Sequence, residues 1–174
     1  MKINLMVLAI ATLMCAVVNE EIMEKKVEDF MIIGISVQTT NENGKSMKDM
    51  GMLWQRFYAE GISGRIPNKE SEEVYVLYTE YESDYTGPYR AIIGYKVGAM
   101  EHIPEGLDGW TFQGGNYVQL TAKGEVPGSV VKIWNEVWAK DAELNRRYTV
   151  DYEVYGTRSQ HGPDSEVDVF IAVK

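Results

Sequence analysis

Hydrophobic and polar positions along the chain follow the two periods that distinguish strands from helices. Apolar and β-branched residues over 28–40 predict a strand that ends at a turn rich in Asn and Gly. Apolar residues at helical spacing over 46–61, stopped by Gly61, predict a helix. Strand-like patterns follow over 73–82 and 89–98, joined by a polar connection of the hairpin type. The first half of the chain therefore predicts a β-α-β-β unit.

The second half of the chain repeats this order of patterns. A strand is predicted over 115–123, a helix over 128–143, and two further strands over 147–156 and 166–173. A short connector that contains Pro and Gly separates the halves. Two such units in tandem predict an α+β fold with a mostly antiparallel sheet of eight strands, two helices and a central ligand cleft.

The two halves also match residue by residue, which indicates a duplication. Leu53–Glu60 and Ile133–Lys140 share one order of aliphatic, Trp, polar, apolar, aromatic, Ala and charged positions, at an offset of 80. Segments before and after them match as well: Val37–Thr40 with Val118–Thr121, and Glu80–Glu82 with Asp151–Glu153. Chance explains any one of these matches, whereas three in the same order are typical of a repeat.

The amino-terminal segment differs from the rest. Lys2 precedes a nearly unbroken apolar run from Ile3 to Val18, which has the length of a signal-peptide core and is short for a bilayer span of about 20 residues. Met23 is a second possible start. We expect 1–22 to be a signal-like or non-native apolar segment and 23–174 to be the domain, cytoplasmic or, if 1–22 acts as a signal peptide, exported. We expect no membrane association of the folded domain.

Charge and composition exclude several classes of function. The formal net charge of -9 would repel nucleic acid, so we expect no direct nucleic-acid binding. One Cys and two widely separated His provide no set of metal ligands, so no metal site is expected. The phosphate-binding and serine-nucleophile motifs are missing from the sequence, and no cofactor is predicted.

The junction of two duplicated units is the natural place for a ligand cleft, and such clefts are lined by aromatic and apolar side chains. The chain has four Trp and eleven Tyr. Trp54 and Trp134 lie at the centre of the apolar face of each helix, where either a core or a pocket role is open. Tyr58 and Trp138, one turn further on, carry the same two alternatives.

Carboxylates on the predicted strand 148–155 are the candidate charged groups. Alternation places Glu153 on the face opposite Tyr152, and either face can be the buried one. A surface position is the ordinary expectation for a carboxylate. Glu82, its partner in the repeat, has the same ambiguity, and the two are predicted to occupy equivalent places near aromatic side chains.

Five segments together resemble the GyrI-like family, the gyrase-inhibitor-like or AraC-type effector-binding domain of bacterial proteins. They are Phe30–Gly34, Ile66–Lys69, Tyr78–Tyr85, Thr121–Gly124 and Asp151–Tyr155. The resemblance implies a duplicated fold with multidrug-type binding of cationic or aromatic small molecules at the junction. It also implies that Glu153, followed by Val154 and Tyr155, lies at the bottom of the cleft.

The main hypothesis is a stand-alone module that senses or sequesters a small molecule, because the chain before residue 27 is too short and apolar for a helix-turn-helix domain. Two alternatives remain open. One is a hydrolase of strained electrophiles in which Glu82 or Glu153 acts as general base. The other is an interaction with a protein partner, as in gyrase inhibition.

Overall fold

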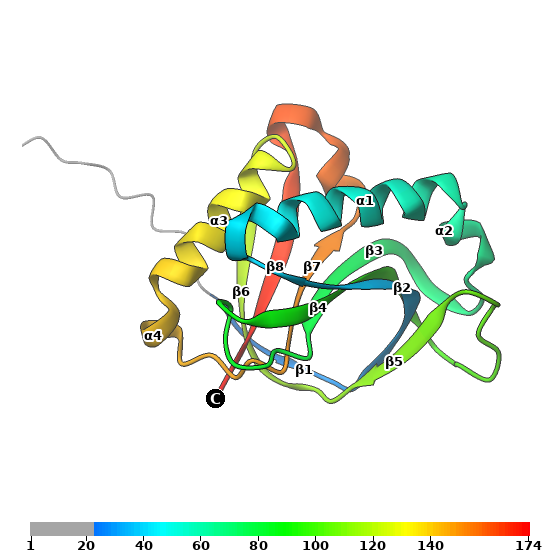
Figure 1. Ribbon diagram of the computed structural model, residues 1–174, viewed down its shortest axis with the longest axis horizontal. Helices are drawn as coiled ribbons and strands as arrows, with labels where there is room; N and C mark the ends of the chain where they lie inside the picture. The colour runs from blue at the N-terminus through cyan, green and yellow to red at the C-terminus, as the bar shows by residue number, and fades with distance from the viewer. Residues whose placement is uncertain (1–22) are drawn as a thin grey trace, which may run out of the picture.

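The computed structural model describes residues 23–174 (Figure 1), so the predicted signal-like segment 1–22 lies outside the described residues. The strands are β1 (Met23–Val27), β2 (Phe30–Thr40), β3 (Lys69–Thr79), β4 (Pro88–Val97), β5 (Asp108–Phe112), β6 (Gly115–Lys123), β7 (Val150–Tyr155) and β8 (Glu166–Val173). The helices are α1 (Lys45–Ala59), α2 (Ile62–Arg65), α3 (Gly128–Ala139) and α4 (Asp141–Leu144). Three short 3-10 turns complete the elements: Glu42–Gly44, Thr157–Gln160 and Gly162–Asp164.

The order of strands in the sheet confirms the predicted α+β duplication. It runs β1-β6-β8-β7-β3-β4-β2-β5, with every neighbouring pair antiparallel. Exchanging the two units leaves this order unchanged when it is read from the other edge. The units therefore meet at the β3–β7 pair, in the middle of the sheet.

The sequence patterns predict no residue range for two of the eight strands, β1 and β5. Each precedes one unit in the chain and pairs with the first strand of the other unit, β1 with β6 and β5 with β2. The four residues Met23–Lys26 are exposed, so β1 carries no buried face that alternation could reveal. Pairing with another strand, rather than burial, stabilises it.

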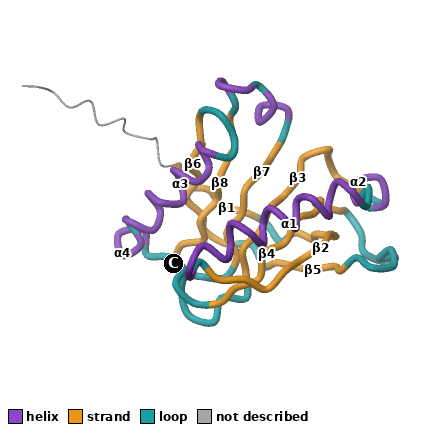
Figure 2. The backbone as a smooth tube through the Cα atoms, turned by 45° about the horizontal axis from the view of Figure 1, so that its top comes forward, coloured by secondary structure: helices purple, strands orange, loops and turns teal. Residues whose placement is uncertain are grey.

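The two long helices cover one face of the sheet, α1 over the first unit and α3 over the second (Figures 1 and 2). Leu53 and Phe57 of α1 are buried against β2 and β4, and Ile133 and Val137 of α3 are buried against β6 and β8. Full burial of a side chain of this size stabilises a fold by about 1.5–3 kcal/mol. Each unit thus has its own core beneath its own helix.

The opposite face of the sheet is also buried, because the sheet curls on itself. Phe30, Leu77 and Tyr152 belong to a third core on that side. Strands β2 and β4 approach each other closely where Gly34 pairs with Gly94, since a Cβ on Gly34 would lie 2.2 Å from the carbonyl oxygen of Ile93. The central strands are therefore covered on both faces, so polar side chains of β7 are buried whichever face they point to.

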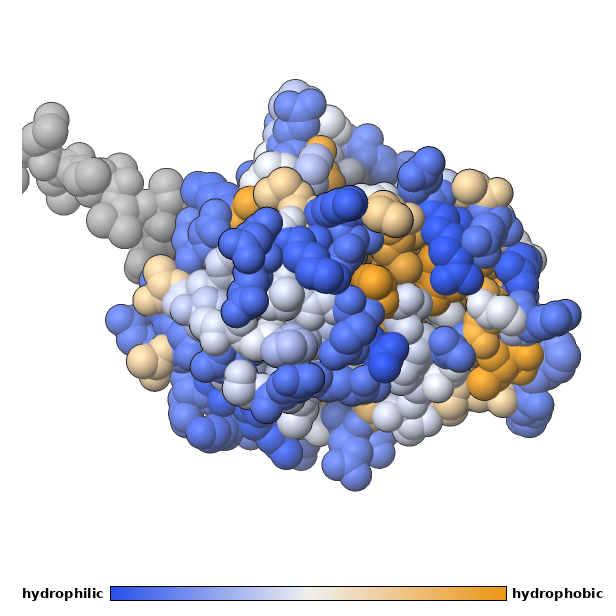
Figure 3. Space-filling model, in the orientation of Figure 1, coloured by the Kyte–Doolittle hydropathy of each residue, from blue (hydrophilic) through white to orange (hydrophobic). Residues whose placement is uncertain are grey.

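The molecular surface is largely hydrophilic on the side drawn in Figure 3, with hydrophobic side chains showing along the lower edge of α1 and near β5. Several exposed large hydrophobic residues lie on α1: Met47 (74%), Met52 (58%) and Tyr58 (71%). No helix within 23–174 is long and apolar enough to cross a membrane.

Candidate functional site

Glu153 lies at the centre of β7 and is almost completely buried, with 2% of its surface exposed. Its backbone partner is Val76 of β3, so it stands at the strand pair where the two units meet. Val76 belongs to the core beneath α1. Because directly paired residues of neighbouring strands point to the same face, the Glu153 side chain points toward the helix layer.

Three neutral donors satisfy the Glu153 carboxylate. The indole Nε1 of Trp134 donates to Oε1 at 2.6 Å, and the hydroxyl of Tyr78 donates to the same oxygen at 2.9 Å. The hydroxyl of Tyr155 donates to Oε2 at 2.7 Å. The donors come from α3, β3 and β7. The carboxylate therefore ties one unit's helix to the central strands of both units.

Burial raises the pKa of Glu153 above its ordinary value, and the hydrogen bonds from Tyr155, Trp134 and Tyr78 only partly oppose this effect. Burial also raises the pKa of Tyr78 and of Tyr155, and the charge of Glu153 raises both further. The two tyrosines are therefore protonated donors at any physiological pH. Of these three side chains, the Glu153 carboxylate is therefore the one whose charge can change.

An aromatic cage surrounds this carboxylate. Trp54 meets Tyr155 edge to face at 5.6 Å, and Tyr58 stacks on Trp54 at 5.6 Å with ring planes 18° apart. On the other side, Trp134 meets Tyr78 edge to face at 5.0 Å and lies 6.3 Å from Trp138. Among the ion pairs formed by residues 23–174, none includes Glu153. The buried carboxylate of Glu153 thus lies among aromatic rings, with no cationic side chain of 23–174 paired to it.

The structure brings together most of the residues singled out from the sequence. Glu153, Tyr155, Trp54 and Trp134 form the inner part of the cage. Tyr58 and Trp138 form its outer layer, in which Tyr58 is 71% exposed and Trp138 stacks on Tyr85 at 5.7 Å.

Glu82 does not join the cage. Strand β3 ends at Thr79, three residues earlier than the predicted strand, and Glu82 lies in the connection to β4 with an exposed side chain. The predicted equivalence of Glu82 and Glu153 is therefore wrong, because Glu153 is buried within β7 whereas Glu82 is exposed beyond the end of β3. Sequence reasoning also missed Tyr78 as a donor, although alternation along 73–82 would have placed it on the same face as Val76.

A second buried carboxylate stands two positions earlier on β7. Asp151 is fully buried, and its Oδ2 accepts hydrogen bonds from Arg146 Nη2 at 2.6 Å and from the Tyr81 hydroxyl at 2.8 Å. Its Oδ1 accepts the backbone N–H of Ala172 at 2.8 Å. The Arg146 side chain is 1% exposed. Unlike Glu153, Asp151 therefore has its own buried cation.

A duplicated α+β fold with a carboxylate at the junction of its units defines a protein of the GyrI-like class, as the sequence resemblance implied. The chain belongs to the family of integron-associated effector binding proteins, whose family model matches residues 21–173.

Solved structures and curated sequences agree with this family. An integron cassette protein from the mobile metagenome of Vibrio cholerae is 31% identical, with a TM-score of 0.69 over 88% of this chain and 95% of that one. The protein SAV2435, solved bound to tetraphenylphosphonium, is 20% identical with a TM-score of 0.74 over 88% of this chain and 94% of that one, and shares the fold. YobU of Bacillus subtilis, named as a candidate transcriptional regulator, is 22% identical over 81% of this chain and 90% of its own length.

Proposed function

We propose that this protein binds lipophilic organic cations at the junction of its two units, with Glu153 as the counter-ion, and so senses or sequesters them. One observation carries the proposal: a buried carboxylate is held by three neutral donors inside an aromatic cage, without a cationic partner among residues 23–174.

The electrostatics of the cage favour a cation with a delocalised or shielded charge. An ionised carboxylate without a cation is costly in a buried place, so a ligand that brings a positive charge recovers much of that cost. A lipophilic cation leaves water easily, and each aromatic face adds a cation–π attraction of about 0.5–2 kcal/mol. The tetraphenylphosphonium bound by SAV2435 is a ligand of this chemistry.

The side chains that must move for a ligand to reach Glu153 belong to the outer layer. Tyr58 is stacked on Trp54 but mostly exposed, and Trp138 is held by its stack on Tyr85. Such surface stacks hold a ring less firmly than core packing does. We place the entry between α1 and α3, where Tyr58 and Trp138 turn outward and their rings then cover the ligand.

Calorimetry with a charged and a neutral ligand tests the proposal. Tetraphenylphosphonium is the cation, and triphenylphosphine oxide is a neutral compound with the same phenyl groups. Glu153→Gln keeps the shape of the side chain and one acceptor oxygen for Trp134 and Tyr78, and removes the charge. We expect this variant to weaken binding of the cation by about 1–3 kcal/mol and to leave binding of the neutral compound nearly unchanged.

Glu82→Gln is the matched control, because Glu82 is an exposed carboxylate outside the cage. It should bind both compounds like the unmodified protein. An equal loss of affinity for both compounds in Glu153→Gln would show that Glu153 has a structural role only. Unaltered tetraphenylphosphonium binding in that variant would place the cation elsewhere.

A further inference from the structure

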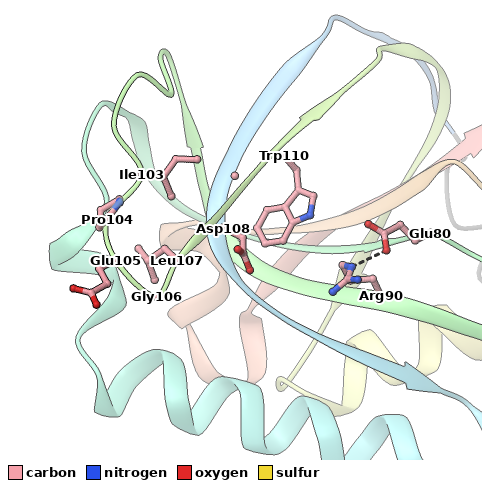
Figure 4. A pocket seen from close by; sticks show the side chains of 10 residues that line it. Glu80, Arg90, Ile103, Pro104, Glu105, Gly106, Leu107, Asp108 and Trp110 are labelled. Atoms are coloured by element: carbon pink, nitrogen blue, oxygen red, sulfur yellow. Dashed lines mark hydrogen bonds and ion pairs between the residues drawn. The ribbon is translucent and has the colours of Figure 1, made fainter.

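A cavity of about 640 Å³ opens away from the Glu153 cage (Figure 4). It is lined by Glu80 just after β3, by Arg90 of β4, by the loop before β5 and by the first residues of β5. None of its lining residues belongs to the cage.

The sheet separates this cavity from the cage. Arg90 precedes Ala91 on β4, and Ile93, two positions further on, is part of the core beneath α1. Alternation therefore turns Arg90 to the opposite face. Trp110 of β5 pairs with Ile32, which belongs to the core on that opposite face. A ligand in this cavity and a ligand at Glu153 would not touch each other.

Trp110 differs from the other three tryptophans. Trp54, Trp134 and Trp138 all stack on or meet other aromatic rings around Glu153. Trp110 is half-buried against the core of this face, and within 23–174 it forms neither a stacked or edge-to-face ring pair nor a hydrogen bond through its indole N–H. Figure 4 shows its ring extending between Asp108 and the Arg90–Glu80 pair. Trp110 therefore offers the exposed part of its ring to the cavity.

The charges that line the cavity are unbalanced toward the negative. Arg90 is its one cation, and that cation is already engaged: Nε donates to Glu80 Oε2 at 2.7 Å and Nη1 donates to Ser36 Oγ at 3.2 Å. The carboxylates of Asp108 and Glu105 form no ion pair or hydrogen bond with the rest of the described chain. One cation and three carboxylates leave a net charge of -2.

We propose that this cavity is a second binding site, for small hydrophilic organic ammonium ions. The Trp110 face contacts the alkylammonium or aromatic part of the ligand, and Asp108 is the unpaired counter-ion beside it. Anionic ligands are disfavoured because Arg90 is already neutralised by Glu80. Within the described part of the chain, no group of three or more acidic, His or Cys residues could hold a metal ion, so an organic cation is the class that fits. The proposal does not depend on cation binding at Glu153.

Fluorine NMR of protein labelled with 5-fluorotryptophan tests the proposal, because each of the four tryptophans gives its own signal. Trp110→Phe assigns the Trp110 signal. The probe is benzyltrimethylammonium, with benzyl alcohol as the neutral and phenylacetate as the anionic comparison. We expect the Trp110 signal to move saturably with the ammonium probe alone, in the unmodified protein and equally in Glu153→Gln.

Asp108→Asn should raise the midpoint of that titration by about two- to fivefold, as expected for the loss of one exposed charge partner. Glu101→Gln is the control, since Glu101 is an exposed carboxylate before the same loop that does not line the cavity. An unmoved Trp110 signal, an equal response to benzyl alcohol or phenylacetate, or an unchanged midpoint in Asp108→Asn would overturn the proposal. Movement of the cage tryptophans alone, lost in Glu153→Gln, would overturn the second site and support the first.

Discussion

Asp151 and Glu153 are buried carboxylates two positions apart on the same face of β7, but among residues 23–174 only Asp151 has a cationic partner. Arg146 Nη2 lies 2.6 Å from Asp151 Oδ2, whereas the partners of Glu153 in the described part of the chain are all neutral donors. Burial raises the pKa of both groups, and for Asp151 the charge of Arg146 is the main opposing effect. Within 23–174, Asp151 is thus neutralised by a buried cation of the same chain, whereas Glu153 is not.

Cation binding should depend on pH through Glu153. Its pKa is raised in the folded protein by burial, and only the ionised form attracts a cation. The affinity for tetraphenylphosphonium, whose own charge does not titrate, should therefore rise as the pH increases through that raised pKa. Calorimetry across the acidic to neutral range measures this. Glu153→Gln should give a flat profile, and a flat profile in the unmodified protein would contradict the counter-ion role.

The free energy of unfolding should change with pH in the direction opposite to that of the cation affinity: it should fall as Glu153 ionises. Because the folded pKa lies above the ordinary value of 4.5, the folded state holds the proton more tightly than the unfolded state. Stability is then greatest below that ordinary value and falls as the pH rises through the folded pKa. Glu153→Gln removes this loss, so it should be more stable than the unmodified protein at pH 7 and equal to it near pH 4.

Thermal unfolding of the ligand-free proteins measures this difference. Glu82→Gln, which changes an exposed carboxylate, should show no such gain at either pH. A Glu153→Gln protein that is less stable at pH 7 would mean that the charge itself contributes to the fold.

Much of this architecture could be predicted from the sequence, because the spacing of hydrophobic residues and the repeated segments both follow from how the elements pack. The helical spacing around Trp54 and Trp134 gave the helices their positions and inner faces, and the order of repeated segments gave the symmetric sheet. Strand β5 was missed because its five residues have no clear alternation. Its place is determined by pairing with β2, a long-range contact that local pattern does not encode.

The side of the sheet to which Glu153 points could not be decided from alternation. That reasoning assumes one wet face, whereas Val150, Asp151, Tyr152 and Glu153 are all buried because the curled sheet covers β7 on both sides. The repeat misplaced Glu82 for a related reason. The match of residue types aligned Glu82 with Glu153, but β3 ends at Thr79, before Glu82 is reached.

Trp134 should set the pH range of cation binding through its indole N–H. That group donates to Glu153 Oε1 at 2.6 Å and stabilises the ionised form. Trp134→Phe keeps an aromatic ring and removes the donor, so the pKa of Glu153 should rise further. The pH profile of tetraphenylphosphonium binding should shift upward, with a loss at neutral pH of about 1 kcal/mol or more.

Trp138→Phe is the comparison for this variant. Trp138 lies next to Trp134 in the cage but forms no hydrogen bond with Glu153. It should lower affinity at all pH values without moving the profile. Equal shifts in the two variants would mean that ring packing, rather than the indole donor, controls the carboxylate.

Arg146 should be essential for stability rather than for ligand binding. Burial alone would lower the pKa of Arg146, but the charge of Asp151 raises it overall, so the guanidinium is charged inside the fold. Arg146→Met leaves Asp151 buried without its cation, which typically costs about 3–5 kcal/mol. Arg56→Met is the control: its partner Glu60 is 2.8 Å away, but both side chains are 43% exposed, and such a pair contributes about 0.3–0.5 kcal/mol.

The pH dependence of the Arg146→Met defect separates a lost charge from lost packing. Without Arg146, the folded pKa of Asp151 rises further above its ordinary value of 3.8, so the variant should be least impaired at low pH and lose stability as the pH rises. Adding Asp151→Asn should restore part of the loss at pH 7, because no buried anion then remains. A defect that is the same at pH 4 and pH 7, and that Asp151→Asn does not relieve, would show that Arg146 contributes by packing alone.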